Sequence, residues 1–268
     1  MPTTDSDGVT IHYTVDGPED APPVLLVEGL GYGRWMWRWL TRDLTPSFRV
    51  VRPDNRGTGD SAVPEGPYTI EEMATDHARV LDDVGVEEVQ VVGASMGGMI
   101  ALALADRDER VETVTALCTS HGGPAAEPTP DAVVEHILSA PDGADERETI
   151  RHRMEPAVSP GFFDREAELA AEIVDARLEG DADDPGREAQ AAAVESFDAS
   201  EWVESIEVPA LVMHGTADRV VPFENGERLA ERLPRATFEP VDDGHHLFFI
   251  EQRDRVDRRI RRFLEEHV

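Results

Sequence analysis

The stretch that most limits how this chain can fold is residues 89–103, Val-Gln-Val-Val-Gly-Ala-Ser-Met-Gly-Gly-Met-Ile-Ala-Leu-Ala. It begins as a β-branched run, passes through Gly-x-Ser-x-Gly and continues as an apolar, alanine-rich segment that favours a helix. A serine on a sharp turn between a strand and a helix is held in a strained conformation with its hydroxyl exposed. We therefore predict that Ser95 is a nucleophile. The alternative is a glycine-rich turn whose serine only caps the helix.

Short apolar runs alternate with helical segments along the rest of the chain. Strands are expected at residues 9–15, 24–27, 48–51, 111–118, 208–214 and 236–241. Thr69 with Glu72 forms a capping box for a helix that Gly85 ends, and a last amphipathic helix is expected from residue 253 to about 266. This alternation predicts an α/β fold, a mostly parallel twisted sheet with helices on both faces.

The composition changes after residue 119. Residues 120 to 205 have no short β-branched runs and are rich in Ala, Glu, Asp and Pro, with helical stretches expected near 130–140, 145–155, 163–179 and 186–197. The strand pattern resumes at residue 208. We interpret residues 120–205 as a helical cap inserted into a core made of residues 1–119 and 206–268.

The charge of the chain is its most unusual bulk property. Among 268 residues, Asp and Glu number 56 against 25 basic residues, all of them Arg, for a net charge of −31. This charge argues against nucleic acid or an anionic membrane surface as a partner. Dispersed acids and absent Lys resemble the proteins of salt-accumulating halophiles, in which molar salt with a Debye length of about 3 Å screens the self-repulsion. We expect the fold or the activity to be lost at low salt.

Targeting and cysteine signals are sparse. No apolar run approaches the roughly 20 residues of a membrane span, and the N-terminus has no signal-peptide pattern, so a cytoplasmic monomer or homodimer is expected. The single cysteine, Cys118, excludes an internal disulfide and lies in an apolar run, which predicts a buried, inert thiol.

Partners for a nucleophilic serine occur further along the chain. Asp218 lies in a tight loop after the strand that ends at His214, where the carboxyl ends of parallel strands gather ligands; the alternative is a turn-forming Asx residue. His245 and His246 follow Gly244 after the last strand, and either could lie over the serine. Adjacent side chains diverge and no ligand cluster accompanies the pair, so no metal is expected there.

Several of these motifs together resemble the α/β-hydrolases, in the branch of single-cap esterases and lactonases. They are Gly29-Leu-Gly31, Asp54-x-Arg56-Gly57-x-Gly59-x-Ser61, Gly93-x-Ser95-x-Gly97-Gly98, Gly215-x-x-Asp218 and Gly244-His245. Tyr68-Thr69, Met96-Gly-Gly-Met99 and Met36-Trp37 most resemble 3-oxoadipate enol-lactonases and anthracycline methylesterases. The family order Ser, Asp, His implies a triad of Ser95, Asp218 and His245, because the family pattern is Gly-His before an apolar stretch and Glu.

The resemblance also implies an activity. We expect hydrolysis of a small ester or lactone, without a cofactor, with an oxyanion hole made by the backbone N–H groups of Leu30 and Met96. Two alternatives stay open. Cofactor-free haloperoxidases and perhydrolases share the motifs, and a non-catalytic ligand-binding relative could keep the triad as a relic.

The oxyanion loop departs from the family, which usually has His-Gly-x-Gly where this chain has Glu28-Gly-Leu-Gly. An unpaired carboxylate there would oppose the oxyanion by about 2–3 kcal/mol. We therefore predict that Glu28 is hydrogen-bonded and points away from the serine, as a neutral acid or paired with Arg56 or Arg34. Arg56 is interpreted as a structural brace with Asp54.

Aromatic residues beside this loop and in the cap are candidates for the substrate pocket, together with a histidine after the strand that carries Cys118. The candidates are Trp35, Trp37, His121, Phe162 and Trp202.

Overall fold

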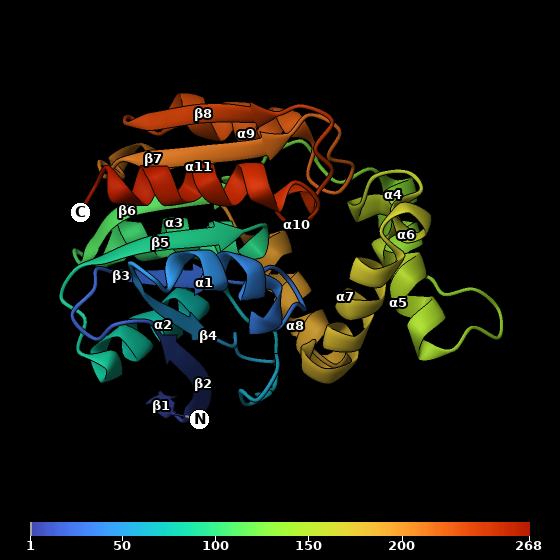
Figure 1. The fold of residues 1–268 in the computed structure, drawn as a ribbon, viewed down its shortest axis with the longest axis horizontal. Coiled ribbons are helices and arrows are strands. Elements are labelled where there is room, and N and C mark those ends of the chain that lie inside the picture. The colour runs from blue at the N-terminus through green and yellow to red at the C-terminus, as the bar shows by residue number, and fades with distance from the viewer. Residues whose placement is uncertain (1) are drawn as a thin grey trace.

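A single eight-stranded sheet forms the centre of the molecule in the computed structural model, which describes residues 2–268 (Figure 1). The strand order is β1-β2-β4-β3-β5-β6-β7-β8; β1 and β2 are antiparallel to their neighbours, and the other pairs are parallel. The bounds are β1 Thr3–Ser6, β2 Val9–Asp16, β3 Pro23–Val27, β4 Arg49–Pro53, β5 Val89–Ala94, β6 Val111–Leu117, β7 Ala210–Gly215 and β8 Ala236–Val241.

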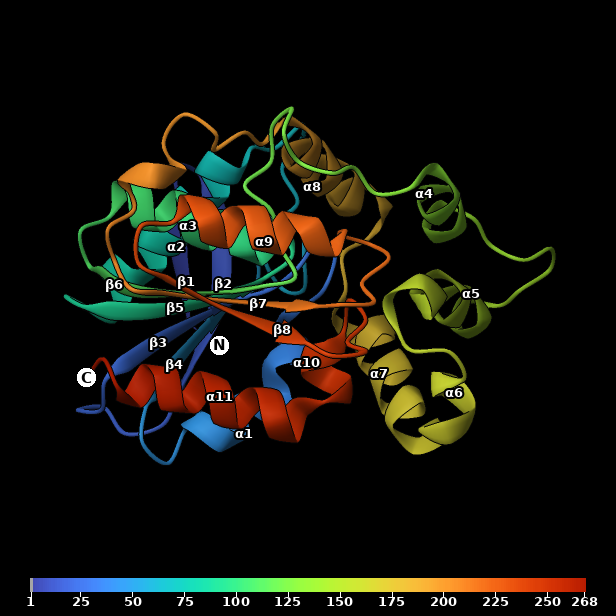
Figure 2. The same ribbon diagram turned by 90° about the horizontal axis from the view of Figure 1, so that it is seen from above.

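Helices cover both faces of this sheet, so the expected mostly parallel α/β architecture is confirmed (Figure 2). One face carries α1 (Arg38–Leu44) and α11 (Arg253–Glu265), and the other carries α2 (Ile70–Val84), α3 (Met96–Arg107) and α9 (Phe223–Arg232). The short elements η1 (Arg34–Trp37) and α10 (Phe248–Glu251) precede α1 and α11. Because both faces are covered, every residue of β5 and β7 is buried, which explains their continuous apolar character.

The local signals of α2 act as expected. The Thr69 side chain accepts from the Glu72 backbone N–H, and the Glu72 carboxylate accepts from the Thr69 N–H at 2.8 Å. Gly85 ends the helix in the left-handed region, at φ 69°.

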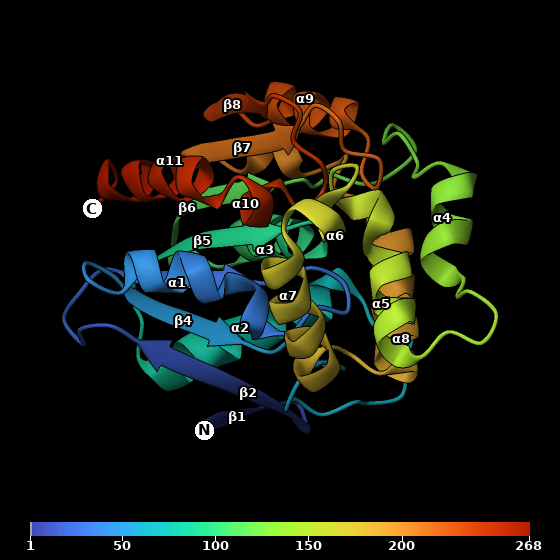
Figure 3. The same cartoon turned by 45° about the vertical axis from the view of Figure 1, so that its right-hand side comes forward.

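Between β6 and β7 the chain forms a separate group of helices, which we call the cap. Its helices are α4 (Asp131–Leu138), α5 (Glu146–Met154), α6 (Phe162–Arg165), α7 (Ala167–Gly180) and α8 (Asp184–Ser196), with the single turns η2 (Glu155–Ala157) and η3 (Val203–Ser205). Figure 1 shows the cap to the right of the sheet, with α8 nearer the core than α4 and α5. In the turned view of Figure 3, α4 is the outermost of the cap helices on the right. A β-bridge between Gly122 and Asp198 joins the two ends of the insertion.

The strand register aligns the residues that follow β5, β6 and β7. Ala94 pairs with Leu117, and Leu117 pairs with Met213. Ser95, Cys118 and His214 therefore lie in one row at the carboxyl edge of the sheet, where ligands bind in open α/β sheets. No helix within residues 2–268 has both the length and the apolar character that a membrane crossing requires.

Candidate active site

Ser95 occupies a strained turn between β5 and α3. Its φ of 56° and ψ of −121° are unfavourable for a residue with a side chain, so the surrounding packing has to impose them. A Cβ on Gly97 would lie 2.1 Å from the Val27 carbonyl oxygen, so only glycine allows this close approach. The Ser95 side chain makes no capping hydrogen bond to α3, which removes the reading of a simple capping serine.

Asp218 is the acid at this edge of the sheet, in the turn after β7. Its Oδ1 accepts the backbone N–H groups of Val220 and Val221 at 2.8 and 3.0 Å. Its Oδ2 lies 2.8 Å from His246 Nδ1 and 3.3 Å from His214 Nε2. Burial alone would raise the pKa of this carboxyl, but the two histidines outweigh it and hold the pKa well below its usual range. Asp218 is therefore a carboxylate that orients an imidazole.

The histidine on Asp218 is His246, so the expected pairing of Asp218 with His245 is wrong. Gly244 is locked against β7: its carbonyl accepts the Ala217 N–H at 2.9 Å, and a Cβ on Gly215 would lie 2.2 Å from that oxygen. With the loop held there, successive side chains diverge and only the second histidine turns toward Asp218. His245 is half-buried; desolvation lowers its pKa, and its electrostatic neighbours include Glu251 and Arg219.

Cys118 lies between Ser95 and His214 in the row described above. The thiol is fully buried, as expected. Burial raises its pKa well above its usual range, and the negative charge of Asp218 adds to the rise. The thiol therefore stays protonated and weakly nucleophilic beside the serine.

Among the backbone N–H groups near Ser95, those of Leu30 and Met96 have no acceptor within residues 2–268. Met96 is the first residue of α3, where helical N–H groups have no intrahelical partner. A Cβ on Gly29 would lie 3.5 Å from Ser95 Cβ, which places the loop before Leu30 against the serine. The neighbouring N–H groups of Gly29, Gly31 and Tyr32 are all bonded, so Leu30 offers the free donor of this loop.

Known proteins share the fold of this chain. The profile of the family described as the alpha/beta hydrolase fold matches residues 22–252. The chain belongs to the α/β-hydrolase family. It is 30% identical over 263 residues to a putative carbamate hydrolase RutD of Azorhizobium caulinodans, covering 92% of each chain. It is 28% identical over 252 residues to 3-oxoadipate enol-lactonase 1 of Acinetobacter baylyi, covering 93% of this chain and 91% of that one.

A solved structure agrees with this assignment. The enol-lactonase from Burkholderia xenovorans LB400 superposes with a TM-score of 0.86 at 29% identity, over 98% of this chain and 100% of that chain. The resemblance expected from the motifs is thus confirmed at the level of the family, and the chain is a hydrolase of this fold.

Glu28, the residue that departs from the family pattern, is completely buried and hydrogen-bonded as predicted. Its Oε1 accepts the Asn55 backbone N–H at 2.7 Å, and its backbone carbonyl accepts Asn55 Nδ2 at 3.1 Å. Burial raises the pKa of the Glu28 carboxyl well above its usual range, and the charge of Asp54 adds to the rise. Through its bonds to Asn55, Glu28 braces the loop that holds Leu30, and its burial favours the uncharged form of the carboxyl.

Asn55 links the loop that begins at Glu28 to helix α2. Its Oδ1 lies 2.8 Å from Nε2 of His77, a fully buried residue. Burial lowers the pKa of His77 to about 3, so the ring is neutral and its Nε2–H donates to the amide oxygen. The sequence carried no signal for this chain of contacts, because its members come from three separate segments.

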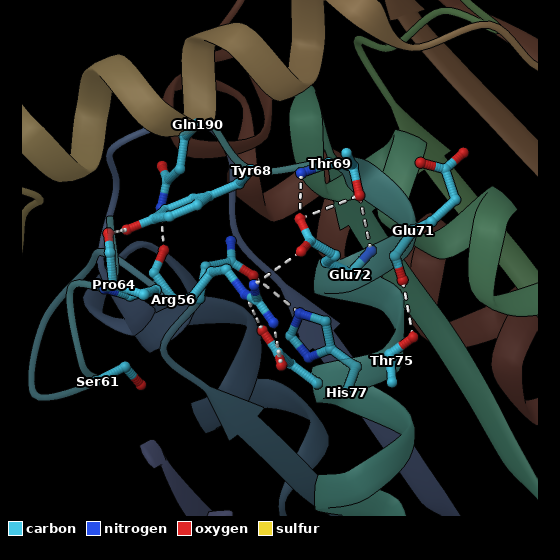
Figure 4. Close-up of polar contacts among 12 residues, drawn as sticks. Arg56, Ser61, Pro64, Tyr68, Thr69, Glu71, Glu72, Thr75, His77 and Gln190 are labelled. Atoms are coloured by element: carbon cyan, nitrogen blue, oxygen red, sulfur yellow. Dashed lines mark hydrogen bonds and ion pairs between the residues drawn. The ribbon is translucent and has the colours of Figure 1, made fainter. Parts of the chain in front are cut away.

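Arg56 is a structural brace, but its partner is not the expected Asp54. Its Nε and Nη2 donate to the two carboxylate oxygens of Asp76 at 2.7 and 2.8 Å, in a buried bidentate pair that ties the loop to α2. Figure 4 shows Arg56 between α2 and the ring of Tyr68, whose centroid lies 5.7 Å from the guanidinium carbon. Asp54 is bonded to Arg34 instead.

Contacts with other residues of the chain hold the five predicted pocket residues in place. Trp35 donates its indole N–H to Asp181 of the cap at 2.8 Å. Trp37 packs against Phe249 with ring centroids 5.6 Å apart, and it shares an apolar cluster with Phe162. Trp202 packs edge-on against Phe197, and His121 is buried with a pKa that desolvation lowers. Their contact with substrate stays a prediction.

One cluster in the cap has the side chains of a metal site: His136, His152 and Glu155, whose ligand atoms lie within 4.8 Å of one another. His136 Nε2 lies 3.3 Å from Glu155 Oε2. The two imidazoles are stacked, with centroids 4.0 Å apart and planes within 21°. Since lone pairs lie in the ring planes, stacked rings do not converge on one ion, and the cluster has no metal-ready geometry.

Proposed function

We propose that this α/β hydrolase cleaves a small carboxylic ester or lactone through an acyl-enzyme on Ser95. The observation that carries the proposal is the strained Ser95 backbone beside two unbonded N–H groups, at the same sheet edge as the Asp218–His246 pair. A serine hydroxyl needs a base, and a base needs an orienting group, to react at neutral pH. Enol-lactonases and esterases among the similar structures support an ester or lactone as the substrate class.

In the first half of the reaction Ser95 Oγ attacks the substrate carbonyl carbon while His246 Nε2 takes the hydroxyl proton. Asp218 holds the Nδ1–H of the ring and stabilises the imidazolium that forms. The carbonyl oxygen becomes an oxyanion and accepts from the N–H groups of Leu30 and Met96. Loss of one such donor typically lowers kcat about 10²–10³-fold.

Collapse of the tetrahedral intermediate breaks the bond to the leaving alcohol, which takes the proton from His246. A lactone keeps its alcohol on the acyl group, because leaving group and acyl group are one chain. Water then attacks the acyl-enzyme by the same steps in reverse, giving the acid and free Ser95. The protein groups supply every proton transfer, and the scheme uses no cofactor.

A panel of nitrophenyl esters of graded acyl length, small lactones and an aryl carbamate, assayed in molar KCl, tests the proposal. We expect ester or lactone turnover with a burst of nitrophenolate stoichiometric with enzyme, and a loss of at least about 10⁴-fold in kcat for Ser95→Ala. Turnover that Ser95→Ala retains, or turnover of the carbamate alone, would overturn it.

A further inference from the structure

The oxyanion loop is bonded to the cap at the residue that follows Leu30. The Gly31 N–H donates to Gln190 Oε1 of α8 at 2.7 Å, and the Gly31 carbonyl accepts the N–H of Ala182 at 2.9 Å. Both peptide groups that flank Gly31 are therefore held by cap residues. Gly31 has a φ of 74°, in the left-handed region that glycine adopts without a steric penalty. Because glycine has no Cβ, its own conformational preference does not fix the backbone here.

Gln190 also holds the loop after β4. Its Nε2 donates to the Arg56 carbonyl at 2.8 Å and to Thr58 Oγ1 at 2.7 Å, and the side chain has no exposed surface. Figure 4 shows Gln190 extending from α8 to the Arg56 backbone. One amide thus uses its oxygen and both its N–H groups to join three segments, and such a buried, fully bonded amide resists displacement.

The part of the cap around Gln190 is packed against the core without space to move. A Cβ on Gly186 would lie 2.1 Å from the Gly57 carbonyl oxygen, so α8 and the loop touch backbone to backbone. Asp181, just after α7, accepts the Gly33 N–H at 3.3 Å. By contrast α4 has no buried residue, and Leu138 at its end is 70% exposed.

We propose that Gln190 is a positioning residue that sets the direction of the Leu30 N–H, so that α8 is a fixed part of the oxyanion hole. The inference rests on the proposed function, because Leu30 matters only where an oxyanion forms. An oxyanion donor acts by pointing at the charge that develops. The Leu30 N–H belongs to the Gly29–Leu30 peptide, and Gln190 holds the next peptide, Leu30–Gly31, so freeing that peptide releases the torsion angles at Leu30 that set the direction of the donor. The cost falls on the transition state, so kcat changes and KM does not.

The test is Gln190→Met, which keeps the length of the side chain and removes all three hydrogen bonds. We expect kcat for a nitrophenyl ester to fall about 10–100-fold with KM within threefold, and inhibition by a trifluoromethyl ketone to weaken in proportion to kcat/KM. Thr58→Val is the matched control: it removes one Gln190 bond and leaves the bond to Gly31, so kcat stays near wild type. If the Met variant fails to fold, Gln190→Ala, which also removes the acceptor of the Gly31 N–H, is read in the same way.

A second measurement does not depend on activity. In the Ser95→Ala background, amide exchange of the 29–33 segment speeds up in Gln190→Met and stays slow in Thr58→Val. A folded Gln190→Met with wild-type kcat and exchange, or with losses in KM alone, overturns the inference. If the wild type turns over no ester and no lactone while exchange is accelerated in Gln190→Met, the proposed function is overturned and the loop contact is established.

Discussion

His246 Nδ1 lies 2.8 Å from Asp218 Oδ2, while its sequence neighbour His245 is half-buried with its carbonyl accepting the Phe248 N–H. Two chemically identical side chains thus differ because the loop after β8 is held by Gly244 against β7. The acid, in turn, is held by two backbone N–H groups and by a second histidine from the end of β7.

His214 is expected to tune the acid. Its Nε2 donates to the Val221 carbonyl at 2.9 Å and lies 3.3 Å from Asp218 Oδ2, with the ring fully buried. In His214→Leu the carboxylate loses one of the two histidines that lower its pKa, so the pKa of Asp218 rises and the carboxylate is held by His246 and two backbone N–H groups alone. Because Asp218 then orients the His246 ring less firmly, we expect kcat to fall about tenfold. In the Asp218→Asn background His214→Leu has no further effect on kcat; an additive loss there contradicts this role.

The substitution Glu28→Gln tests whether residue 28 acts through its hydrogen bond from Asn55 or through an ionisable carboxyl group. The folded state raises the pKa of Glu28 above its ordinary 4.5, so the native protein holds this proton more tightly than the unfolded chain. Stability from this group is present below pH 4.5 and is lost as pH rises, by about 1.4 kcal/mol per unit until the native group ionises. The amide oxygen of Gln still accepts the Asn55 N–H. We expect kcat within threefold of wild type and a flatter dependence of unfolding free energy on pH; a tenfold loss of kcat would show that the acid itself is needed.

Asp257 in α11 is a second carboxyl whose raised pKa makes the fold less stable as pH rises. Burial and the neighbouring Asp43 raise its pKa to about 7 from 3.8, so it destabilises the fold increasingly between these two values, by about 1.4 kcal/mol per unit. Urea unfolding of Asp257→Asn in molar KCl is expected to show a larger gain over wild type at pH 8 than at pH 5. Equal gains at both pH values contradict the raised pKa.

Salt should control the stability of the whole molecule. A net charge of −31 repels itself in dilute buffer, and molar salt screens that repulsion over about 3 Å. Thermal melts are expected to show a higher Tm in 3 M KCl than in 0.1 M KCl. A comparison with sucrose at equal osmolality separates charge screening from the general stabilisation by solutes that are excluded from the protein surface. A Tm that does not depend on salt would contradict the halophile interpretation.

Local signals explain what could be predicted from the sequence. The strand, the glycines and the apolar helix around Ser95 are contiguous, and so are Thr69, Glu72 and Gly85 at the two ends of α2. Each of these structures is decided by residues a few positions apart. The strand β1 and the helix α9 escaped prediction because β1 buries only Ser6 and α9 buries only three residues.

Contacts between distant segments explain what could not be predicted. Gln190 is separated by 159 residues from Gly31 and by 134 from Arg56, and nothing in the pattern of α8 distinguishes it from a solvent-facing glutamine. Asp54 lies two positions from Arg56 in the sequence, but the packing of α2 on the loop pairs Arg56 with Asp76 instead. His245 and His246 differ by one position, so backbone direction, which the sequence does not carry, decides between them.

The most direct test of the central claim compares His246→Ala with His245→Ala under identical conditions in molar KCl. Both variants are treated with an ester substrate and with a fluorophosphonate, and the adduct is located by mass spectrometry. We expect His246→Ala to lose at least about 10³-fold in kcat and in the labelling rate of Ser95, while His245→Ala stays within about tenfold of wild type. Loss in His245→Ala with retention in His246→Ala, or an adduct on a residue other than Ser95, would contradict it.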